Sequence, residues 1–301
     1  MTTPHIASRS GRTPGAGFSA SASLRFAAHR LQLARIALLN LMPTKQVTER
    51  QFRRAFTAAA RPVDWILTLP DGYRPTTTSA DHIARFYTPW SQLDLSALDG
   101  LIVTGAPVER LPFEEVRYWP ALVRCLDEAR SLRLPSLFVC WGAQAALYRF
   151  HNVPKRPLPE KCFGVFEQHA RDPREAARYG LPARFYIPVS RHTEVCREDL
   201  PAGAGLDILA DSPDSGLCLL SEPATRALYI FNHFEYEAET LQLEYVRDRA
   251  AGQSIRPPCN LASRRLPGAR PIDLWSDTAR RFFAGWMAGI EADPQAKIAV
   301  D

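Results

Sequence analysis

The segment 137–147 reads LFVCWGAQAAL: an apolar run ends at Cys140, and small residues that favour a helix follow. This pattern predicts a short buried strand, a tight turn at the cysteine and then a helix. A side chain at such a corner points away from the sheet, and the free N–H groups at the start of the helix favour a thiolate there. Cys140 is therefore a candidate nucleophile. Most free cysteines are instead small core residues, and the local sequence alone leaves both interpretations open.

The apolar runs before this corner predict the rest of a sheet. Buried strands are expected at residues 36–42, 63–69 and 101–103, and amphipathic helices at residues 48–60, with Thr48 as N-cap, and 113–129. Strands without polar alternation that alternate with helices indicate an α/β fold. The sequence therefore predicts a mostly parallel sheet with helices on both faces.

The second half of the chain has a stronger β pattern. Additional short β segments are expected at residues 163–166, 185–189, 217–220 and 227–231, and helices at residues 238–251 and 273–290. Residues 70–98 are rich in Thr and Pro and are expected to form an irregular packed or binding loop. A chain of this length can bury one sizeable core, so residues 36–301 are predicted to form a single domain.

The excess of positive charge lies at the start of the chain. Residues 1–35 contain five arginines and no acidic residue, whereas residues 36–301 balance 32 basic against 32 acidic residues. Residues 1–35 are also rich in Ser, Ala and Gly, and they are predicted to be a disordered basic leader. Nucleic-acid binding requires a clustered basic face. The remaining chain shows none, so no nucleic-acid partner is expected.

Cysteine spacing and hydropathy indicate the compartment. The six cysteines form no C-x-x-C pair and have no histidine at the spacing of a zinc site, so no metal site is expected. Scattered cysteines indicate a reducing compartment, and no apolar run approaches the length of a membrane span. The sequence therefore predicts a cytoplasmic protein without a membrane partner.

A cysteine nucleophile needs a base, and the base needs an orienting group. His233 follows the apolar run 228–231 and therefore stands at the carboxyl end of a predicted strand, the edge where sites of α/β sheets gather. Glu235 is two residues further on, so in an extended segment both side chains face the same side. A surface His-x-Glu pair at a helix start is the alternative interpretation, and together with Cys140 the catalytic one is favoured.

Several blocks of the sequence resemble one enzyme family. They are IALLNLMPTKQVTERQF at 36–52, DGLIVTGAPVERLPFEEVRYWP at 99–120, LFVCWGAQAAL at 137–147, EKCFGVFE at 160–167, SRHTEV at 190–195, and residues 233–248. Together they resemble the homoserine O-acyltransferases of the homoserine O-succinyltransferase type. The fold of that family is similar to the class I glutamine amidotransferases. The resemblance covers residues 36–250 in order.

The resemblance implies a catalytic triad of Cys140, His233 and Glu235. An acyl-CoA would acylate the cysteine, and the hydroxyl group of an amino acid would then take the acyl group. This is a ping-pong transferase reaction through an acyl-Cys140 thioester, and in this family it belongs to methionine biosynthesis. Backbone N–H groups of Trp141 and of Gly105, in the turn 104–106, are the expected oxyanion donors.

Substrate contacts of the family fall on four further residues, Lys161, Ser190, Arg247 and Lys45. A guanidinium such as that of Arg247 suits an α-carboxylate, because it can bind both oxygens. Lys45 would help to hold the CoA or the acyl group. Without the resemblance, Arg247 would be interpreted as an exposed helix residue paired with Glu244, and Lys45 as a solvated loop lysine.

Glu109 is expected to select the acyl donor, because succinyl-transferring members of the family resemble one another in having glycine there. A glutamate fills space in the acyl pocket and repels the distal carboxylate of a succinyl group. The expected activity is therefore homoserine O-acetyltransferase, with acetyl-CoA as a substrate and no bound cofactor. Homoserine O-succinyltransferase and serine O-acetyltransferase are the alternatives, since one methylene contributes only about 1–3 kcal/mol of discrimination.

The resemblance also implies a homodimer that acts on small molecules. Residues 253–272 and the segment LWSDT at 274–278 depart from the family pattern, which affects the expected oligomer contacts and the choice of acceptor. A glutamine amidotransferase-like hydrolase would need a synthetase partner, and nothing in this sequence predicts one. A catalytically silent binding protein is a third alternative, disfavoured by the intact triad.

Overall fold

A computed structural model describes Met1, residues 33–261 and residues 273–292 of the chain. Residues 2–32 of the predicted leader lie outside the described residues, and so does most of the divergent stretch 253–272. The disordered leader and the single domain therefore stay predictions. The first strand begins at Ala34, just inside the predicted leader.

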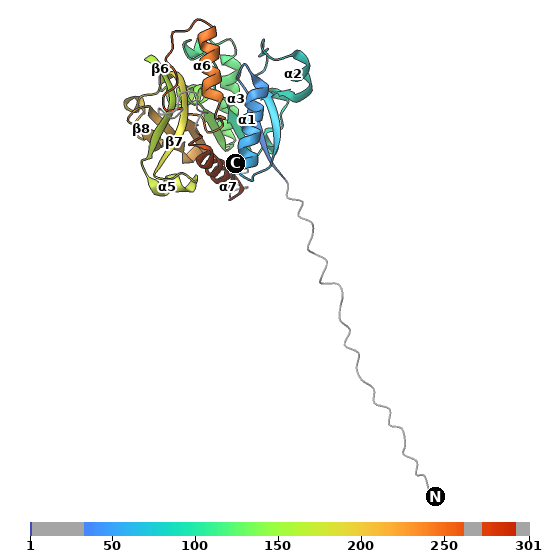
Figure 1. Cartoon of the computed structure of the whole chain (residues 1–301). Helices are drawn as coiled ribbons and strands as arrows, with labels where there is room; N and C mark the ends of the chain where they lie inside the picture. The colour runs from blue at the N-terminus through green and yellow to red at the C-terminus, as the bar shows by residue number, and fades with distance from the viewer. Residues whose placement is uncertain (2–32, 262–272, 293–301) are drawn as a thin grey trace. The chain divides into compact units, whose positions relative to one another are not determined.

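The described residues form a ten-stranded mixed sheet with helices packed against it (Figure 1). The strands are β1 (Ala34–Leu39), β2 (Val63–Leu69), β3 (Tyr87–Pro89), β4 (Gly100–Val103), β5 (Ser136–Val139), β6 (Arg156–Ala170), β7 (Arg184–Glu194), β8 (Asp207–Ser212), β9 (Gly216–Glu222) and β10 (Ala227–Ile230). The helices are α1 (Lys45–Ala58), α2 (Ala80–Phe86), α3 (Trp119–Ser131), α4 (Trp141–His151), α5 (Pro173–Arg178), α6 (Thr240–Ala250) and α7 (Ser276–Ala292).

The sheet has a parallel part and an antiparallel part that meet at β10. Its strand order is β3-β2-β1-β4-β5-β10-β9-β8-β6-β7. Neighbouring strands are parallel from β3 to β10 and antiparallel from β10 to β7. The predicted α/β fold with a mostly parallel central sheet is confirmed. The later β segments are not all short, however, because β6 has 15 residues and β7 has 11.

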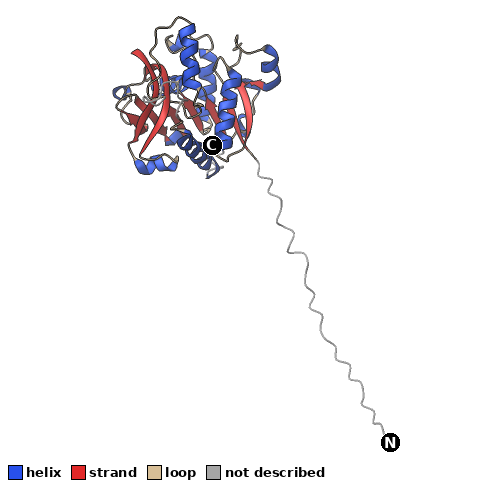
Figure 2. Ribbon diagram, in the orientation of Figure 1, coloured by secondary structure: helices blue, strands red, loops and turns tan. Residues whose placement is uncertain are grey.

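Helices cover both faces of the parallel part (Figure 2). Alternate residues of β1 point into different cores: Ile36 into the core shared with α1 and α7, and Ala37 into the core shared with α3 and α4. On the first face Phe56 of α1 packs on Phe283 of α7, with ring centroids 4.9 Å apart. Burial of each such side chain contributes about 1.5–3 kcal/mol. The two cores together hold the edge of the sheet that carries the site.

Four helices begin elsewhere than predicted, and those expected from residues 238 and 273 begin at Thr240 and Ser276. The helix expected at residues 48–60 begins at Lys45, and Thr48 is a buried helical residue rather than the N-cap, since the amides of Val47 and Thr48 both donate to the Thr44 carbonyl. The helix expected from residue 113 begins at Trp119, with a proline in its first turn, where proline is well tolerated. Residues 70–98 include α2 and β3, so that stretch is not wholly irregular.

A buried ion cluster joins β9 and β10 to the helices behind them. The carboxylate of Glu222 accepts hydrogen bonds from both terminal nitrogens of Arg130, at 2.6 and 3.1 Å, and from the hydroxyl of Tyr229 at 2.5 Å. His151 Nε2 lies 3.1 Å from the same carboxylate. Burial acts to raise the pKa of Glu222, but the hydrogen bonds from His151, Arg130 and Tyr229 outweigh it and lower the pKa to about 2.

Replacement of this carboxylate should make the protein less stable, chiefly above acidic pH. We expect Glu222→Gln to lower the free energy of unfolding at neutral pH by about 3 kcal/mol, because it leaves a partly buried arginine unpaired. The pKa of Glu222 is depressed on folding, so its contribution is present above its ordinary pKa of 4.5 and is lost as the pH falls toward 2. Urea unfolding at several pH values checks both points. Equal stability of the two proteins at neutral pH would contradict the assignment.

Candidate active site

Cys140 occupies a strained corner between β5 and α4. Its backbone has φ of +53° and ψ of −118°, a left-handed conformation that is rare for any residue except glycine. Its N–H donates to the carbonyl oxygen of Ile230 at 2.6 Å, which ties the corner to β10. The sequence-predicted strand, turn and helix are confirmed here. Such strain persists where the surrounding structure fixes it, and it is concentrated at functional sites.

Close packing under the cysteine explains the glycine at position 142. A Cβ atom on Gly142 would lie 2.7 Å from the Thr104 carbonyl oxygen and 2.8 Å from that of Val103. Only glycine permits this approach of backbone to backbone. As a result, α4 begins directly beside the end of β4, and the turn 104–106 lies next to Cys140.

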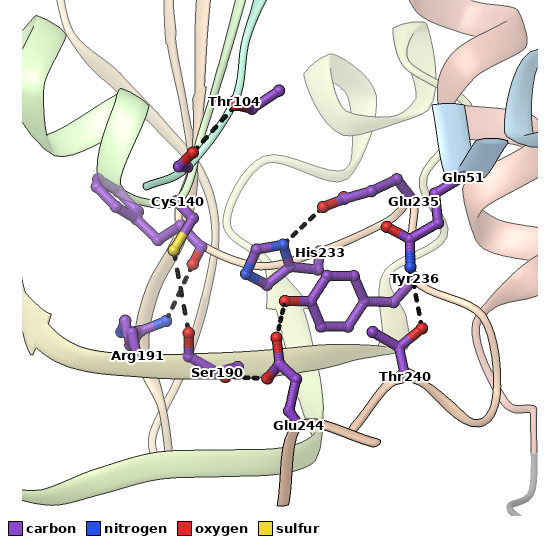
Figure 3. A network of polar contacts seen from close by, with 12 residues as sticks. Gln51, Thr104, Cys140, Ser190, Arg191, His233, Glu235, Tyr236, Thr240 and Glu244 are labelled. Carbon is purple, nitrogen blue, oxygen red and sulfur yellow. Dashed lines mark hydrogen bonds and ion pairs between the residues drawn. The ribbon is translucent and has the colours of Figure 1, made fainter. Parts of the chain in front are cut away.

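His233 lies beside the sulfur of Cys140, between the cysteine and Glu235 (Figure 3). His233 Nδ1 is 2.7 Å from Glu235 Oε1, and both side chains are buried. The second ring nitrogen, Nε2, has no hydrogen-bond partner among the described residues and points toward Cys140. The backbone N–H of His233 donates to the Pro188 carbonyl oxygen at 3.0 Å, which fixes the segment to β7. The sulfur of Cys140, the imidazole of His233 and the carboxylate of Glu235 thus follow one another across the site, as the predicted triad requires.

The surroundings of His233 favour its charged form. Burial acts to lower the pKa of the imidazole, but the Glu235 carboxylate and the Cys140 sulfur outweigh it, and together they hold the pKa well above 6.5. Tyr236 stacks on the imidazole with ring centroids 4.0 Å apart, which restricts the ring further.

The two backbone N–H groups that the sequence predicted as oxyanion donors, those of Gly105 and Trp141, lie beside the sulfur. A Cβ atom on Gly105 would lie 3.7 Å from both the Cys140 sulfur and the backbone nitrogen of Trp141, so the three groups surround one small space. Neither N–H donates a hydrogen bond to another described residue. Trp141 is the first residue of α4, and the N–H groups of a first helical turn are left free for such a ligand.

The sulfur opens into a pocket of about 430 Å³. This pocket brings together seven of the residues predicted from the sequence, namely Gly105, Glu109, Cys140, Lys161, Ser190, His233 and Arg247. Glu235 and Trp141 are buried behind its wall. Residues of both parts of the sheet line it, and its volume is in the range of pockets for small ligands.

Charged residues of β6 and α6 form one side of this pocket. Lys161 Nζ lies 2.8 Å from Asp248 Oδ2 and 3.9 Å from the centroid of the Phe163 ring. Arg247 Nε donates to Asp248 Oδ1 at 2.8 Å. Arg247 is therefore paired with its neighbour Asp248. The alternative interpretation, which paired Arg247 with Glu244, is wrong about the partner. Its side chain stays 56% exposed, so part of the guanidinium is free for a ligand.

A second polar group connects the pocket wall to the stacked tyrosine. Ser190 Oγ donates to Glu244 Oε2 at 2.6 Å, and the Tyr236 hydroxyl donates to Glu244 Oε1 at 2.7 Å (Figure 3). Burial, followed by the carboxylates of Glu244 and Glu235, raises the pKa of Tyr236 well above its usual value, so the hydroxyl stays protonated as a donor. Glu244 is thus held in the pocket by two hydroxyl groups.

Glu109 points its carboxylate at the backbone of β7. The N–H of His192 donates to Glu109 Oε2 at 2.5 Å. Lys155 donates from its ammonium to the backbone carbonyl of Glu109, which fixes the loop from a second side. Burial raises the pKa of the Glu109 carboxyl, although the His192 N–H and Lys161 act in the opposite direction. The glutamate therefore occupies a defined part of the pocket wall.

Lys45 lies apart from the residues that line the pocket. It is fully buried at the start of α1, and its ammonium donates to the carbonyl oxygens of Asn40 at 2.7 Å and Met42 at 3.1 Å. It is not a solvated loop lysine. Burial lowers the pKa of Lys45 to about 7, and Glu49 offsets this only in part. Since Met42 lines the pocket, Lys45 supports the wall from behind.

Comparison with known proteins identifies the family. The family model described as homoserine O-succinyltransferase matches residues 19–293. The chain belongs to the homoserine O-succinyltransferase family. Among the relatives, a homoserine O-acetyltransferase of Novosphingobium aromaticivorans is 46% identical over 253 residues, which cover 84% of this chain and 83% of the relative. A protein of the same name from a Chelativorans species is 42% identical over 252 residues, covering 84% and 81% of the two chains.

Solved structures that resemble this family member share its fold. A glutamine amidotransferase from Thermotoga maritima has a TM-score of 0.54 at 14% sequence identity, covering 88% of this chain and 98% of that one. A glutamine amidotransferase from Methylobacillus flagellatus has a TM-score of 0.55 at 12% identity, with 85% and 94% coverage. At such identities the likeness concerns the fold alone, and it confirms the predicted glutamine amidotransferase-like architecture.

The sequence did not single out three residues of the site, Tyr236, Glu244 and Asp248. A signal for two of them was present: Glu244 and Asp248 are three and seven residues after Leu241, so they share the buried face of α6.

Within residues 33–261 and 273–292, no group of His, Cys, Asp and Glu is arranged to hold a metal ion. In the same ranges, no helix combines the length and apolar character that a membrane span needs.

The charge of Glu235 should control the protonation of His233. In Glu235→Gln we expect the pKa of His233 to fall, because burial still lowers it while the main group that raises it is gone. An NMR titration of the imidazole signals measures this pKa directly.

Glu237→Gln is the matched control, because Glu237 is two residues further on and pairs with Arg54 instead. This variant should leave the titration midpoint of His233 unchanged. The same midpoint in Glu235→Gln and in the unmodified protein would mean that Glu235 does not set the charge of the imidazole.

Proposed function

We propose that this protein is a homoserine O-acetyltransferase, which transfers the acetyl group of acetyl-CoA to the hydroxyl oxygen of L-homoserine. The observation that carries the proposal is the strained Cys140, which faces the His233–Glu235 pair in a pocket that also contains Glu109 and Glu244. The names of the relatives and of the family support the same chemistry.

In the first half-reaction the thiolate of Cys140 attacks the thioester carbon of acetyl-CoA. His233, which has taken the thiol proton at Nε2, is the charged partner that the raised pKa of this group favours. The carbonyl oxygen becomes an oxyanion and binds the N–H groups of Gly105 and Trp141, an interaction that typically accelerates such a step by about 10²–10³. The bond to the CoA sulfur then breaks, and CoA leaves as a thiol with the proton from His233.

In the second half-reaction the hydroxyl of homoserine replaces CoA. Neutral His233 accepts the hydroxyl proton as the oxygen attacks the acetyl-Cys140 thioester. The new carbon–oxygen bond forms, the carbon–sulfur bond breaks, and the thiolate of Cys140 is restored beside the imidazolium. Glu235 holds the imidazole so that Nε2 faces the reacting atoms in both halves.

The polar side of the pocket suits an α-amino acid. The exposed part of the Arg247 guanidinium can bind the α-carboxylate, and Glu244 offers a carboxylate for the α-ammonium. Ser190 fixes Glu244 through its hydroxyl. Lys161 balances the two acidic side chains Glu244 and Asp248, with its ammonium within 3.8 Å of both.

Lys45 takes a supporting role. Its ammonium holds the Asn40 and Met42 carbonyls, and Met42 and Pro43 form the wall opposite α6. Lys45 would therefore act on the acyl donor through the shape of this wall.

The same proposal includes a role in methionine biosynthesis, a place in the cytoplasm, a homodimer and a reaction that needs no bound cofactor.

A matrix of two donors and two acceptors tests the function. CoA release is measured with acetyl-CoA or succinyl-CoA and with L-homoserine or L-serine. We expect turnover with acetyl-CoA and homoserine to exceed every other combination by about tenfold or more, the size of effect expected for one methylene. A preference for serine, or glutamine hydrolysis without CoA, would replace the proposal with one of those activities.

Loss of the sulfur should remove both the intermediate and the turnover. Mixing the protein with acetyl-CoA alone should add one acetyl group to the peptide that contains Cys140, as detected by mass spectrometry, and Cys140→Ala should form no adduct. Cys125→Ala is the control, because Cys125 is a buried cysteine of α3 that does not line the pocket. No acetyl adduct on the unmodified protein would overturn the ping-pong route.

Position 109 should set the choice of donor. We expect Glu109→Gly to raise the ratio of kcat/KM for succinyl-CoA over acetyl-CoA by at least about tenfold, which corresponds to about 1.4 kcal/mol. The glycine removes both the volume and the negative charge that oppose a succinyl carboxylate. Glu109→Gln separates the two effects because it keeps the volume. An unchanged ratio in both variants would show that Glu109 does not select the donor.

A further inference from the structure

Arg191 is a buried cation directly behind the catalytic residues. It belongs to β7, next to Ser190, and only 2% of its surface is exposed. The side chains of neighbouring strand residues point to opposite faces. Ser190 therefore lines the pocket of Cys140, whereas the guanidinium of Arg191 extends beneath the segment that carries His233.

The guanidinium binds only neutral oxygen atoms. Its Nη1 donates to the side-chain oxygen of Asn232 at 2.7 Å and, at 3.5 Å, to the carbonyl oxygen of Phe231. Its Nη2 donates to the carbonyl oxygen of Ser215. Among the described residues, no carboxylate forms an ion pair with Arg191, and its Nε has no hydrogen-bond partner.

A buried charge without a carboxylate in direct contact is expensive, even though Glu194 lies nearby: a Cβ atom on Gly216 would be 3.4 Å from Glu194 Oε2 and 3.7 Å from Arg191 Nη2. Arginine cannot lose its proton in a protein, and the effective penalty for burying such an ion is several kcal/mol even after relaxation. A neutral residue of similar volume would be the more stable choice if the position served packing alone. The cation therefore has a task that needs several fixed donors.

The contacts of the segment 230–233 show what that task is. The Ile230 carbonyl accepts from the Cys140 N–H, the Phe231 N–H donates to the Cys218 carbonyl, and the His233 N–H donates to the Pro188 carbonyl. The Phe231 carbonyl and the Asn232 side chain remain, and both accept hydrogen bonds from Arg191. Arg191 thus supplies the donors for the two residues that directly precede His233.

We propose that Arg191 is a positioning residue of the triad, which holds Phe231 and Asn232 so that the imidazole of His233 faces the sulfur of Cys140. The proposal rests on the proposed function for its kinetic readout. A displacement of about 1 Å in a catalytic group can reduce a rate by about 10². The free Nε2 of His233 has no other hydrogen bond that would restore its place.

The test uses two variants of the full chain and one control. Arg191→Met removes the donors and keeps an unbranched side chain, and Arg191→Lys keeps the charge and at most part of the contacts. Arg171→Met is the control, because Arg171 is half exposed after β6 and pairs with Asp211, which keeps Arg197 as a second partner. Like Arg191→Met, the control Arg171→Met removes one positive charge from the antiparallel part of the sheet.

The first readout is the burst of thioester formation with acetyl-CoA. The amplitude of the burst measures the fraction of protein that is folded and able to react, and its rate constant measures the rate of the chemical step. For Arg191→Met we expect a rate constant at least about tenfold lower, at an amplitude close to that of the unmodified protein and with KM values for both substrates within about threefold. Arg191→Lys should recover part of the rate, and Arg171→Met should match the unmodified protein.

The second readout needs no acyl donor. Alkylation of Cys140 by iodoacetamide at neutral pH, followed on its peptide by mass spectrometry, should be slower in Arg191→Met, because a displaced imidazole no longer stabilises the thiolate. A lower burst amplitude with an unchanged rate constant, together with unchanged alkylation, would assign Arg191 to stability alone and overturn the proposal. Slower alkylation in a protein that shows no burst at all would instead retain the positioning role and overturn the proposed function.

Discussion

The left-handed backbone of Cys140 is the constraint on which the rest of the site depends. Such a conformation costs about 1–3 kcal/mol in a residue other than glycine, and it is maintained because β5, β10 and α4 fix the chain around it. The absence of a side chain at Gly142 lets α4 approach β4 at backbone distance. The same packing therefore places the sulfur, the helix N-terminus and the two expected oxyanion donors as one rigid unit.

The remaining groups reach this unit from the antiparallel part of the sheet. β10 is the last parallel strand and its carboxyl end leads to His233, whereas β7 contributes Ser190 and α6 contributes Glu244. Open α/β sheets bind ligands at the carboxyl ends of their parallel strands. Here the long antiparallel strands close that edge into a pocket. The parallel part thus carries the proposed nucleophile, and the antiparallel part carries Lys161 and Ser190, two of the proposed substrate contacts.

The sequence predicted the parallel part of the sheet well, and it singled out the three residues of the proposed triad, because both depend on local patterns. Buried parallel strands are continuous apolar runs, the turn at Cys140 joins such a run to a helix, and His233 and Glu235 are separated by one residue. The features that the sequence did not predict depend on contacts between distant segments. Nothing local distinguishes Arg191 in β7 from a solvent-facing strand arginine, and Glu244 acquires its place only when α6 packs over Ser190. The start of α1 was misplaced because Thr48 resembles a cap.

The charges of the pocket explain why a zwitterion suits it better than a singly charged molecule. Each charged group already has a protein partner: Lys161 and Arg247 bind Asp248, Ser190 and Tyr236 bind Glu244, and the His192 N–H binds Glu109. A molecule with a single charge would match only one of Arg247 and Glu244, and it would lie next to the other without compensation. An amino acid brings both charges at once, so that Arg247 and Glu244 each gain an opposite charge while their present partners stay in place. Under the proposed function, the buried carboxylate of Glu109 would repel the distal carboxylate of a succinyl group, and an uncharged acetyl group avoids this conflict.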